Sequence, residues 1–551
     1  MKIYLSSLLL LCGLYSHAQI AADEIAKKSD SIFNEYKDKP GVAVMIVQDG
    51  KVAFTKGYGL ANLEYNIPVT PATVFDIASV SKQFTGYAIS TLIQQGKISP
   101  EDDIHKYLPW VPDFGKKITI RHLIHHTSGL RDWPEGLRAA GWRWEEAFGW
   151  QDIMRMVKQQ KELDFEPGSK YQYSNTGYNL LSAIVEKVTG KTLPIWVDEN
   201  IFKPLQMNSS QVLADYSIVI KNVAGSYYQD GKDYHKASDM LTAWGSSSIF
   251  TTVEDLAKWV IAFQKGLDEK DPVYTRMIET DKLNNGEKNS YAYGNSVTDD
   301  QGLMNINHTG GWAGFATVIS NYPGQRISII LLSNNGNFNS YGKANNVARA
   351  LFGNKFNTGE PKANVVNWGS SPTVKVDGSI LKKYTNTYKL GDGWYVTFTL
   401  EDGKLMVQAS GESKFPTEPK SDTVIWVPAY SSSFTFRDIT DKANTAKYRD
   451  IMAKRITPVQ FDASQMEQYT GNYYSTELEA TYRIYVDKRK LMVHHMRLGD
   501  FELTPDIEDA GMFNGDVGRM QFEKNAQGKI TGFKLSGGRI RNIRFDLISP
   551  K

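Results

Sequence analysis

The sequence predicts an α+β fold, in which one antiparallel sheet is flanked by helices and an all-β region follows. Three observations lead to this prediction. Hairpin patterns stand near both ends of residues 41–333, whereas the apolar residues between them recur mostly at helical spacing. Such hairpins can bury their apolar faces in one shared sheet that helices cover. After Ala350 the helical pattern stops, and two copies of a β-rich pattern follow.

The first elements are a helix and a hairpin. Apolar side chains recur at helical spacing in residues 21–36. Residues 41–48 and 51–55 are rich in residues that favour strands, and the Asp49-Gly50 pair between them suits a two-residue hairpin turn.

The next stretch, residues 75–86, joins an extended run to an amphipathic one at residues 83–95. Ser79 therefore lies where the chain enters a helix, and Lys82 follows on the same face. A serine hydroxyl becomes a good nucleophile when a base lies within hydrogen-bond reach, and an amine one turn away can be that base. This spacing is also common on solvated helices, so its meaning depends on partners elsewhere in the chain.

Further patterns fill the region up to the second hairpin. Residues 118–130 suggest a short helix that ends at glycine, and residues 175–189 suggest an amphipathic helix closed by Gly190. Residues 251–255 form a capping box that opens another helix. The second hairpin, residues 314–333, has Pro-Gly at its turn.

Residues 131–150 carry four tryptophans among charges and glycines in a predicted loop. These indoles could form the apolar rim of a substrate cleft, or a lid packed on its own tryptophans. The four residues are Trp133, Trp142, Trp144 and Trp150.

The all-β region contains an internal repeat at a nearly constant offset. The motif at residues 384–388 returns at 469–473, and the Lys-Leu-Met-Val run at residues 404–407 returns at 490–493. Two β-meanders follow from this, either as two small barrels, lipocalin-like, or as two halves of one barrel.

The N-terminus, residues 1–18, has the pattern of a signal peptide, and no other segment is apolar enough to span a membrane. Cleavage after Ala18 would remove Cys12, the only cysteine, so the stability of the mature chain must come from core packing. A lipoprotein anchored through Cys12 is the less favoured alternative. The net charge of +2 gives no reason to expect nucleic acid as a partner.

Two clusters downstream supply what Ser79 needs. Residues 167–175 offer a phenol, Tyr173, and a carboxamide, Asn175, just before a helix. Residues 308–314 enter a strand with several glycines, which let a substrate approach the backbone closely.

In this order, Ser79-x-x-Lys82, Tyr173-x-Asn175 and His308-Thr309-Gly310 resemble the motifs of the class C β-lactamase and penicillin-binding-protein family of serine hydrolases. The sequence around these motifs is also similar to that of the family, over roughly residues 24–350. The resemblance implies a β-lactamase/transpeptidase-like fold for this part of the chain.

The resemblance also implies a role for each matching residue. Ser79 would be the acylated nucleophile, and Lys82 and Tyr173 would form its base system, with the choice of principal base left open. Asn175 would hold Lys82 and the acyl side chain of the substrate. The backbone amides of Ser79 and Gly311 would form the oxyanion hole, which contributes about 3 kcal/mol per donor.

His308, Thr309 and Gly310 would belong to the strand that binds substrate. His308 stands where penicillin-binding enzymes and β-lactamases usually carry lysine, a permanent cation that suits a free carboxylate, whereas histidine is largely neutral at about pH 7. With Lys82, it would also supply the charge or dipole that stabilises a phenolate at Tyr173. The histidine and the β-repeats favour the esterase, amidase and D-aminopeptidase branch that this chain resembles.

Three histidines could in principle bind zinc from one helical face, namely His122, His125 and His126. No cysteine or acidic ligand set accompanies them, and residues 126–130 match a structural segment of the family. We therefore expect neither a metal nor another cofactor.

The sequence thus predicts an exported, periplasmic or secreted serine hydrolase that acts through an acyl-enzyme on a small ester, an amide or a D-amino-acid peptide. One alternative is a β-lactamase or DD-peptidase acting on cell-wall peptides, and another is a penicillin- or peptide-binding protein without turnover. The expected parts are a signal peptide at 1–18, a hydrolase domain at 19–352, a linker at 353–378, and β-repeats at 379–460 and 461–551.

Overall fold

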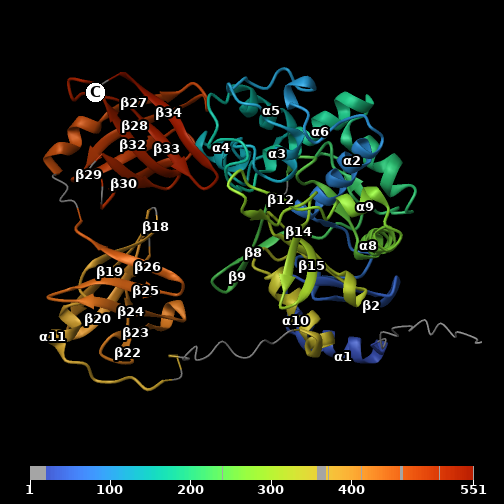
Figure 1. The fold of residues 1–551 in the computed structure, drawn as a ribbon, viewed down its shortest axis with the longest axis horizontal. Coiled ribbons are helices and arrows are strands. Elements are labelled where there is room, and N and C mark those ends of the chain that lie inside the picture. The colour runs from blue at the N-terminus through green and yellow to red at the C-terminus, as the bar shows by residue number, and fades with distance from the viewer. Residues whose placement is uncertain are drawn as a thin grey trace, which may run out of the picture. The chain divides into compact units, whose positions relative to one another are not determined.

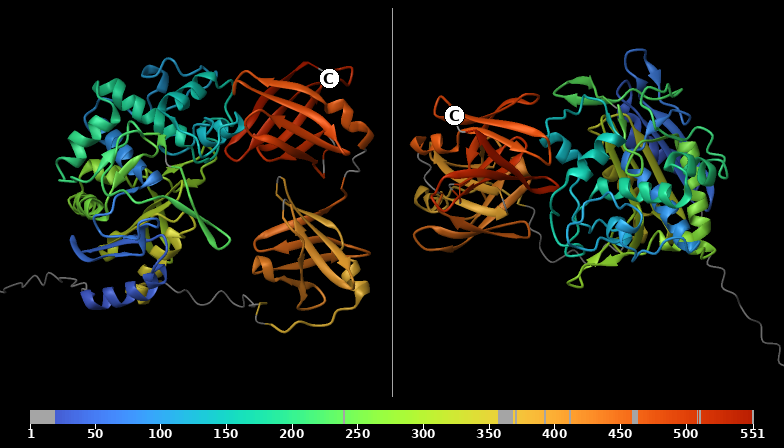
Figure 2. Two further views of the ribbon diagram at one scale, coloured as in Figure 1. Left: turned by 180° about the vertical axis from the view of Figure 1, so that it is seen from behind. Right: turned by 90° about the horizontal axis from the view of Figure 1, so that it is seen from above.

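The computed structural model describes residues 20–238, 240–356, 368–369, 371–391, 393–410, 412–458, 463–507, 509 and 511–549. The predicted signal peptide and much of the predicted linker lie outside these residues. The chain divides into two compact units, one made of residues up to Leu137 and Trp142–Asn357, the other of Arg138–Gly141 and the residues from Thr358 onward. Figures 1 and 2 show the ribbon from three directions.

The first unit is built on a six-stranded sheet in which each strand is antiparallel to its neighbours. Both predicted hairpins belong to it, because Val42–Gln48 of the first hairpin pairs with Ile327–Ser333 of the second. This confirms the predicted α+β class. In spatial order the strands are β14 (Ser296–Asp300), β15 (Leu303–Trp312), β16 (Phe315–Tyr322), β17 (Ile327–Ser333), β1 (Val42–Gln48) and β2 (Lys51–Tyr58).

Strand β1 is buried along its whole length because helices cover both faces of the sheet. Val42 and Val44 point into a core shared with the helices at Ala22–Phe33 and Ser340–Phe352, while Ala43 and Met45 point into a larger core shared with those at Lys82–Gln94, Asn175–Thr189 and Val253–Asp268. The helices of this region are α1 (Ala22–Phe33), α2 (Lys82–Gln94), α3 (Ile120–Ile124), α4 (Trp133–Ala139), α5 (Trp150–Gln159), α6 (Asn175–Thr189), α7 (Leu193–Val197), α8 (Val253–Asp268), α9 (Pro272–Arg276) and α10 (Ser340–Phe352).

Short strands and 3₁₀ turns connect these elements. The turn η2 (Ala78–Ser81) precedes α2, and η5 (Pro323–Gln325) joins β16 to β17 as the Pro-Gly pair predicts. The short strands are β3 (Leu60–Asn62), β4 (Ile67–Pro68), β5 (Phe75–Asp76), β6 (Phe148–Gly149), β7 (Gln211–Val212), β8 (Tyr227–Asp230), β9 (Asp233–Lys236), β10 (Leu241–Thr242), β11 (Ile249–Thr251), β12 (Asp281–Lys282) and β13 (Lys288–Asn289).

Two predicted helix ends are confirmed. Gly190 closes α6 in the left-handed conformation, with φ of 72°. At the start of α8, the Thr252 hydroxyl accepts a hydrogen bond from the Asp255 amide at 3.1 Å. Only this half of the predicted capping box forms: the Asp255 carboxylate, which a full box would direct to the Thr252 amide, instead accepts from the Ser209 amide at 2.7 Å and ties a neighbouring loop to the helix.

The predicted helix at residues 118–130 is wrong in its end. Helix α3 stops at Ile124, well before Gly129, because His126 adopts a left-handed φ of 58° that a helix cannot continue through. Gly129 is needed for another reason: a β-carbon there would overlap the carbonyl oxygen of Phe165. The glycine therefore lets two loops approach closely rather than ending a helix.

The second unit contains two all-β sheets, each with its own apolar core. The first follows α11 (Gly378–Lys382) and has nine strands, in spatial order β21 (Phe415–Pro416), β20 (Lys404–Ala409), β19 (Trp394–Glu401), β18 (Thr387–Gly391), β26 (Ile451–Ile456), β25 (Ala443–Tyr448), β24 (Ser432–Ile439), β23 (Val424–Val427) and β22 (Glu418–Pro419). The second is a closed barrel of β27 (Gly471–Ser475), β28 (Ala480–Asp487), β29 (Lys490–His495), β30 (Gly499–Pro505), β31 (Met512–Gly515), β32 (Gly518–Lys524), β33 (Ile530–Gly537) and β34 (Ile540–Ser549).

The two sheets preserve the register of the sequence repeat. Phe398 pairs with Val407 in the first sheet, and Ile484 pairs with Val493 at the matching place in the barrel. The repeated tyrosines also correspond. The Tyr388 hydroxyl donates to the Tyr384 carbonyl oxygen at 3.4 Å, and the Tyr473 hydroxyl donates to the Tyr469 carbonyl oxygen at 2.8 Å. Of the two arrangements that the repeat allows, the structure has two separate sheets.

Within the described part of the chain, no helix combines the length and the apolar character that crossing a bilayer requires.

Candidate active site

Ser79 lies in the tight turn η2, at the point where the chain leaves β5 for α2. Ala78 has a φ of 47°, in the left-handed region that a β-carbon disfavours. Its amide donates a hydrogen bond at 2.7 Å to Oδ1 of Asp76, which is itself buried. This bond holds a strained turn in which Ser79 is partly exposed while its neighbours are buried.

Lys82 is fully buried, and its amine is held by three oxygen atoms. Nζ lies 3.1 Å from Oγ of Ser79, 2.7 Å from Oδ1 of Asn175 and 2.8 Å from the carbonyl oxygen of Ser246. Hydrogen bonds of this kind offset the free energy of burying a charged amine. The amine is therefore fixed within hydrogen-bond reach of the serine hydroxyl, as the sequence predicts.

Asn175 starts helix α6 and is bound by Asp132, a buried acid that the sequence does not single out. The Asp132 carboxylate accepts from the Asn175 amide at 2.6 Å and from its Nδ2 at 3.1 Å. With Nδ2 occupied in this way, Oδ1 faces Lys82.

Tyr173 comes from the irregular segment before α6, and His126 holds this segment at two points. The His126 carbonyl accepts from the Gln172 amide at 2.9 Å, and its Nδ1 accepts from the Ser174 amide at 3.1 Å. The Tyr173 ring lies 4.3 Å from the His126 ring between centroids, and Lys82 Nζ lies 4.9 Å from the Tyr173 centroid. The phenol predicted as a base partner is thus beside the amine.

The strand predicted to bind substrate is the last part of β15. Strand β14 pairs with β15 only as far as Asn307, so the residues after it form an edge of the sheet on that side. Gly310 packs directly on the serine turn: a β-carbon there would overlap the carbonyl oxygen of Ile77, which also accepts from the Thr317 hydroxyl at 2.9 Å. A β-carbon at Gly311 would meet open space. Thr309 is exposed.

His308 is buried, and both of its ring nitrogens have partners. Nδ1 lies 2.6 Å from the Thr309 carbonyl oxygen and must donate to it, so Nε2 accepts from the Tyr291 hydroxyl at 2.8 Å. Burial, together with the charge of Lys82, lowers the pKa of His308 to about 3. The imidazole is therefore neutral and acts on Tyr173 as a dipole and not as a cation, with ring centroids 6.1 Å apart.

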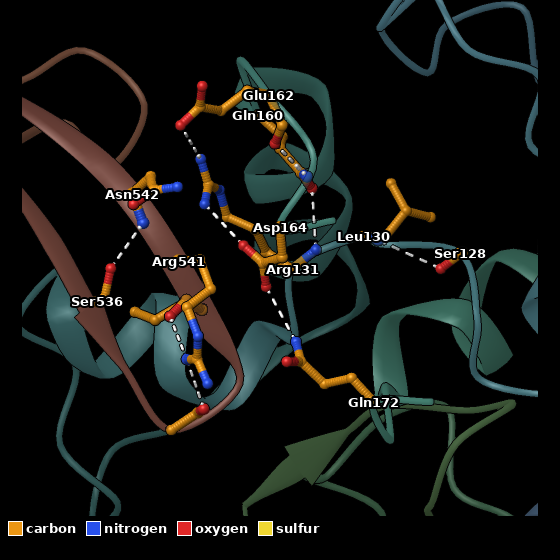
Figure 3. Close-up of polar contacts among 12 residues, drawn as sticks. Ser128, Leu130, Arg131, Gln160, Glu162, Asp164, Gln172, Ser536, Arg541 and Asn542 are labelled. Carbon is orange, nitrogen blue, oxygen red and sulfur yellow. Dashed lines mark hydrogen bonds and ion pairs between the residues drawn. The ribbon is translucent and has the colours of Figure 1, made fainter. Parts of the chain in front are cut away.

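A buried ion pair fixes the loop before Asp132. Arg131 and Asp164 have side chains 2% and 0% exposed, and their N–O distance is 2.9 Å. Figure 3 shows Asp164 between Arg131 and Gln172. Asp164 Oδ1 pairs with Arg131, and Asp164 Oδ2 accepts a hydrogen bond from Gln172 Nε2 at 3.0 Å. Because Gln172 adjoins Tyr173, this network connects the two segments that bring the phenol and Asp132 to the site.

The four tryptophans of the predicted loop pack on other aromatic residues. Trp150 stacks on Trp244, while Trp133 and Trp142 lie against Phe148. Trp144 is 44% exposed and lies 5.7 Å, between ring centroids, from Trp312, the residue after Gly311. Residues 131–150, predicted as a loop, contain helix α4, and these ring contacts are with Phe148, Trp244 and Trp312 and not with one another, which differs from the predicted lid packed on its own tryptophans. Trp144, the exposed one of the four, is the candidate for a rim residue.

The three candidate zinc ligands do not share one helical face. His126 lies beyond the end of α3, and His125 Nδ1 is 2.7 Å from the carbonyl oxygen of Tyr291. Among the described residues, no three or more His, Cys, Asp or Glu side chains gather in a way that could hold a metal ion.

The structure therefore brings Ser79, Lys82 and Asn175 together by hydrogen bonds and places Tyr173 and His308 beside them by ring contacts. Asp132 and Tyr291 join this set without having been predicted. Neither belongs to a motif of fixed spacing. Asp132 binds Asn175 and Tyr291 binds His308, residues that are distant from them in the sequence, so these contacts can be seen only in the folded structure.

Comparisons with known proteins show which proteins this chain is similar to. The "Penicillin-binding protein 4*" of Bacillus subtilis (strain 168) is 28% identical over 414 residues, which is 71% of this chain and 89% of that protein. A "D-aminopeptidase" of Gluconobacter oxydans (strain 621H) is 26% identical over 312 residues, 57% of this chain but only 59% of that protein. The octameric penicillin-binding protein homologue from Pyrococcus abyssi shares the fold, with a TM-score of 0.54 at 21% identity over 86% of this chain and 98% of that one.

The profile of the Beta-lactamase family matches residues 30–354, which contain every candidate site residue named above. With more than half of the sequence matched, the chain belongs to the Beta-lactamase family.

Proposed function

We propose that this chain is an exported serine hydrolase that forms an acyl-enzyme on Ser79 and acts on small esters, amides or D-amino-acid-containing peptides. The observation that carries the proposal is the placement of the Lys82 amine, 3.1 Å from the Ser79 hydroxyl and fixed by Asn175 and the Ser246 carbonyl. At this distance the amine, in its neutral form, can take the serine proton as the hydroxyl attacks, and in its charged form it can stabilise a phenolate at Tyr173 that takes this proton.

In the proposed reaction, Ser79 Oγ attacks the carbonyl carbon of the substrate while its proton passes to the Lys82 and Tyr173 system. The negative oxygen of the tetrahedral intermediate accepts from the amides of Ser79 and Gly311. The leaving group then takes the proton, and the acyl group stays on Ser79. Water, activated by the same base system, attacks the ester and releases the acid.

The state of His308 supports the esterase, amidase or D-aminopeptidase activity over the alternatives. A neutral imidazole with both nitrogens occupied supplies no positive charge for the free carboxylate of a penicillin or a cell-wall peptide. The exposed Trp144 beside Trp312 instead provides an apolar surface for the acyl part of a substrate.

A β-lactamase or DD-peptidase activity is the second candidate, because the chain is similar to the Bacillus penicillin-binding protein over 89% of that protein's length. A binding protein without turnover agrees less well with the complete set of contacts around Lys82. Export rests on the signal-peptide pattern of residues 1–18, and we retain the predicted part boundaries at residues 19–352, 353–378, 379–460 and 461–551 as proposals.

Two measurements test the proposal. A fluorophosphonate probe should label the wild type and not Ser79→Ala, and labelling that survives this substitution would contradict the nucleophile. Turnover of p-nitrophenyl butyrate, D-Ala-p-nitroanilide and nitrocefin, assayed side by side, ranks the substrate classes. Fast nitrocefin hydrolysis without esterase activity would overturn our interpretation of His308.

A further inference from the structure

Asp132 is a fully buried acid whose carboxylate faces Asn175. Its Oδ1 accepts from the backbone amide of Asn175 at 2.6 Å and from that of Thr176 at 3.4 Å. Its Oδ2 accepts from Asn175 Nδ2 at 3.1 Å. One carboxylate thus binds both the backbone and the side chain of the residue that contacts the Lys82 amine.

These contacts decide which way the Asn175 amide points. An ionised carboxylate only accepts hydrogen bonds, so the side of the Asn175 amide that faces Asp132 must be Nδ2. The carbonyl side, Oδ1, is then the atom that faces Lys82 Nζ, at 2.7 Å. With the amide reversed, an NH₂ group would face the ammonium, and two donors would oppose each other.

The backbone around Asp132 is held on both sides. Before it, Arg131 forms the buried ion pair with Asp164. After it, the Trp133 amide donates to the Thr176 hydroxyl at 3.0 Å. Asp132 is therefore fixed against the first turn of α6, and its carboxylate has a defined place.

We propose that Asp132 is a positioning residue: it sets the orientation of the Asn175 amide and thereby aims the Lys82 amine at Ser79. This inference rests on the proposed function, in which Ser79 is the nucleophile. Asp132 would touch no substrate, and its effect would pass through Asn175.

The test is a double-mutant cycle on the polarity of the contact. Asp132→Asn keeps an acceptor for the backbone amides but turns an NH₂ group toward Asn175. Asn175→Asp places a second carboxylate against Asp132. The double variant, Asp132→Asn with Asn175→Asp, restores one donor, one acceptor and an oxygen facing Lys82. The readout is the rate at which a small fluorophosphonate labels the full chain, since this probe does not depend on contacts to a substrate side chain.

We expect each single variant to label about tenfold or more slowly, as expected for disturbing a hydrogen bond to a charged group. We expect the double variant to label faster than either single one, which shows that the two side chains are coupled. A role confined to stability would change the free energy of unfolding of the variants but not the labelling rate of the folded protein. Labelling of Asp132→Asn at the wild-type rate would overturn the inference, and so would a double variant slower than both singles. If Asp132→Asn does not fold, Asn175→Asp tests the same contact from the other side, and wild-type labelling of that variant contradicts the inference.

Two controls separate the possible failures. Asp255→Asn removes the charge of another buried acid that also accepts from a backbone amide, and it should label at the wild-type rate at a temperature where it is folded. Ser79→Ala in the same assay tests the proposed function itself. Labelling lost in Ser79→Ala but unchanged in Asp132→Asn refutes only the role of Asp132, whereas labelling that persists in Ser79→Ala refutes the nucleophile.

Discussion

Replacing His308 by glutamine should remove a specific part of the acid sensitivity of the first unit. The unfolded chain protonates this histidine at its ordinary pKa of 6.5, whereas burial beside Lys82 lowers the pKa in the folded chain to about 3. Between these values the unfolded state binds more protons than the folded state. The free energy of unfolding therefore falls as the pH falls through this window, and the full contribution is present above the unfolded pKa.

The magnitude follows from the two pKa values. Between about pH 7.5 and about pH 5, the linkage relation gives a loss of about 2 kcal/mol from His308 alone. The figure depends little on the folded value, because that range lies well above it. Glutamine does not titrate, yet it offers an acceptor for the Tyr291 hydroxyl and a donor for the Thr309 carbonyl.

The assay is urea denaturation of the wild type and of His308→Gln at both pH values, followed by a signal from the first unit. The wild type should lose about 2 kcal/mol more than the variant on acidification. His122 and His125, whose pKa values burial also lowers, titrate in both proteins and cancel in the comparison. Equal losses would show that folding leaves the pKa of His308 near its ordinary value, which would contradict a histidine held neutral by burial beside Lys82.

Three further predictions concern packing around the site. Gly310→Ala should slow fluorophosphonate labelling and lower the free energy of unfolding by about 1–3 kcal/mol, because its β-carbon would overlap the Ile77 carbonyl beneath the serine turn. Gly324→Ala, where a β-carbon meets open space, should change neither quantity. Equal behaviour of the two variants would show that Gly310 is not needed for this packing. Asp164→Asn should lower the free energy of unfolding by about 3–5 kcal/mol, since it removes the closer of two carboxylates that pair with the buried Arg131, Asp164 at 2.9 Å and the half-exposed Glu162 at 3.9 Å. Asp268→Asn, at the exposed pair with Arg326, should change it by about 1 kcal/mol or less in the same urea titration. Trp144→Ala should lower kcat/KM for p-nitrophenyl phenylacetate by about 2–10-fold and leave that for p-nitrophenyl acetate unchanged, and equal losses on both esters would exclude a contact with the acyl group.

The elements predicted well from the sequence are those decided by local chemistry. The Asp49-Gly50 turn defines the first hairpin, and Gly190 ends α6, because each conformation depends on the residues at that place. Lys82 reaches Ser79 for a similar reason, since the two residues are one turn apart.

The elements predicted poorly depend on contacts between distant segments. Helix α3 ends early because His126 turns toward the Tyr173 segment, which no local pattern signals. Asp132 and Tyr291 gain their parts only when the fold brings them to Asn175 and His308. Closure of the barrel likewise depends on β27 pairing with β34, which lie at opposite ends of the repeat.

Hydrolysis through an acyl-enzyme requires that Ser79 carry the acyl group of the substrate during turnover. The most direct measurement is to quench a reaction with p-nitrophenyl butyrate early, digest the protein and locate the adduct by mass spectrometry. We expect the mass of one butyryl group on the peptide that contains Ser79, and no adduct on the corresponding peptide of Ser79→Ala. Hydrolysis of the ester with the butyryl group on another residue, or at an unchanged rate in Ser79→Ala, would contradict an acyl-enzyme at Ser79.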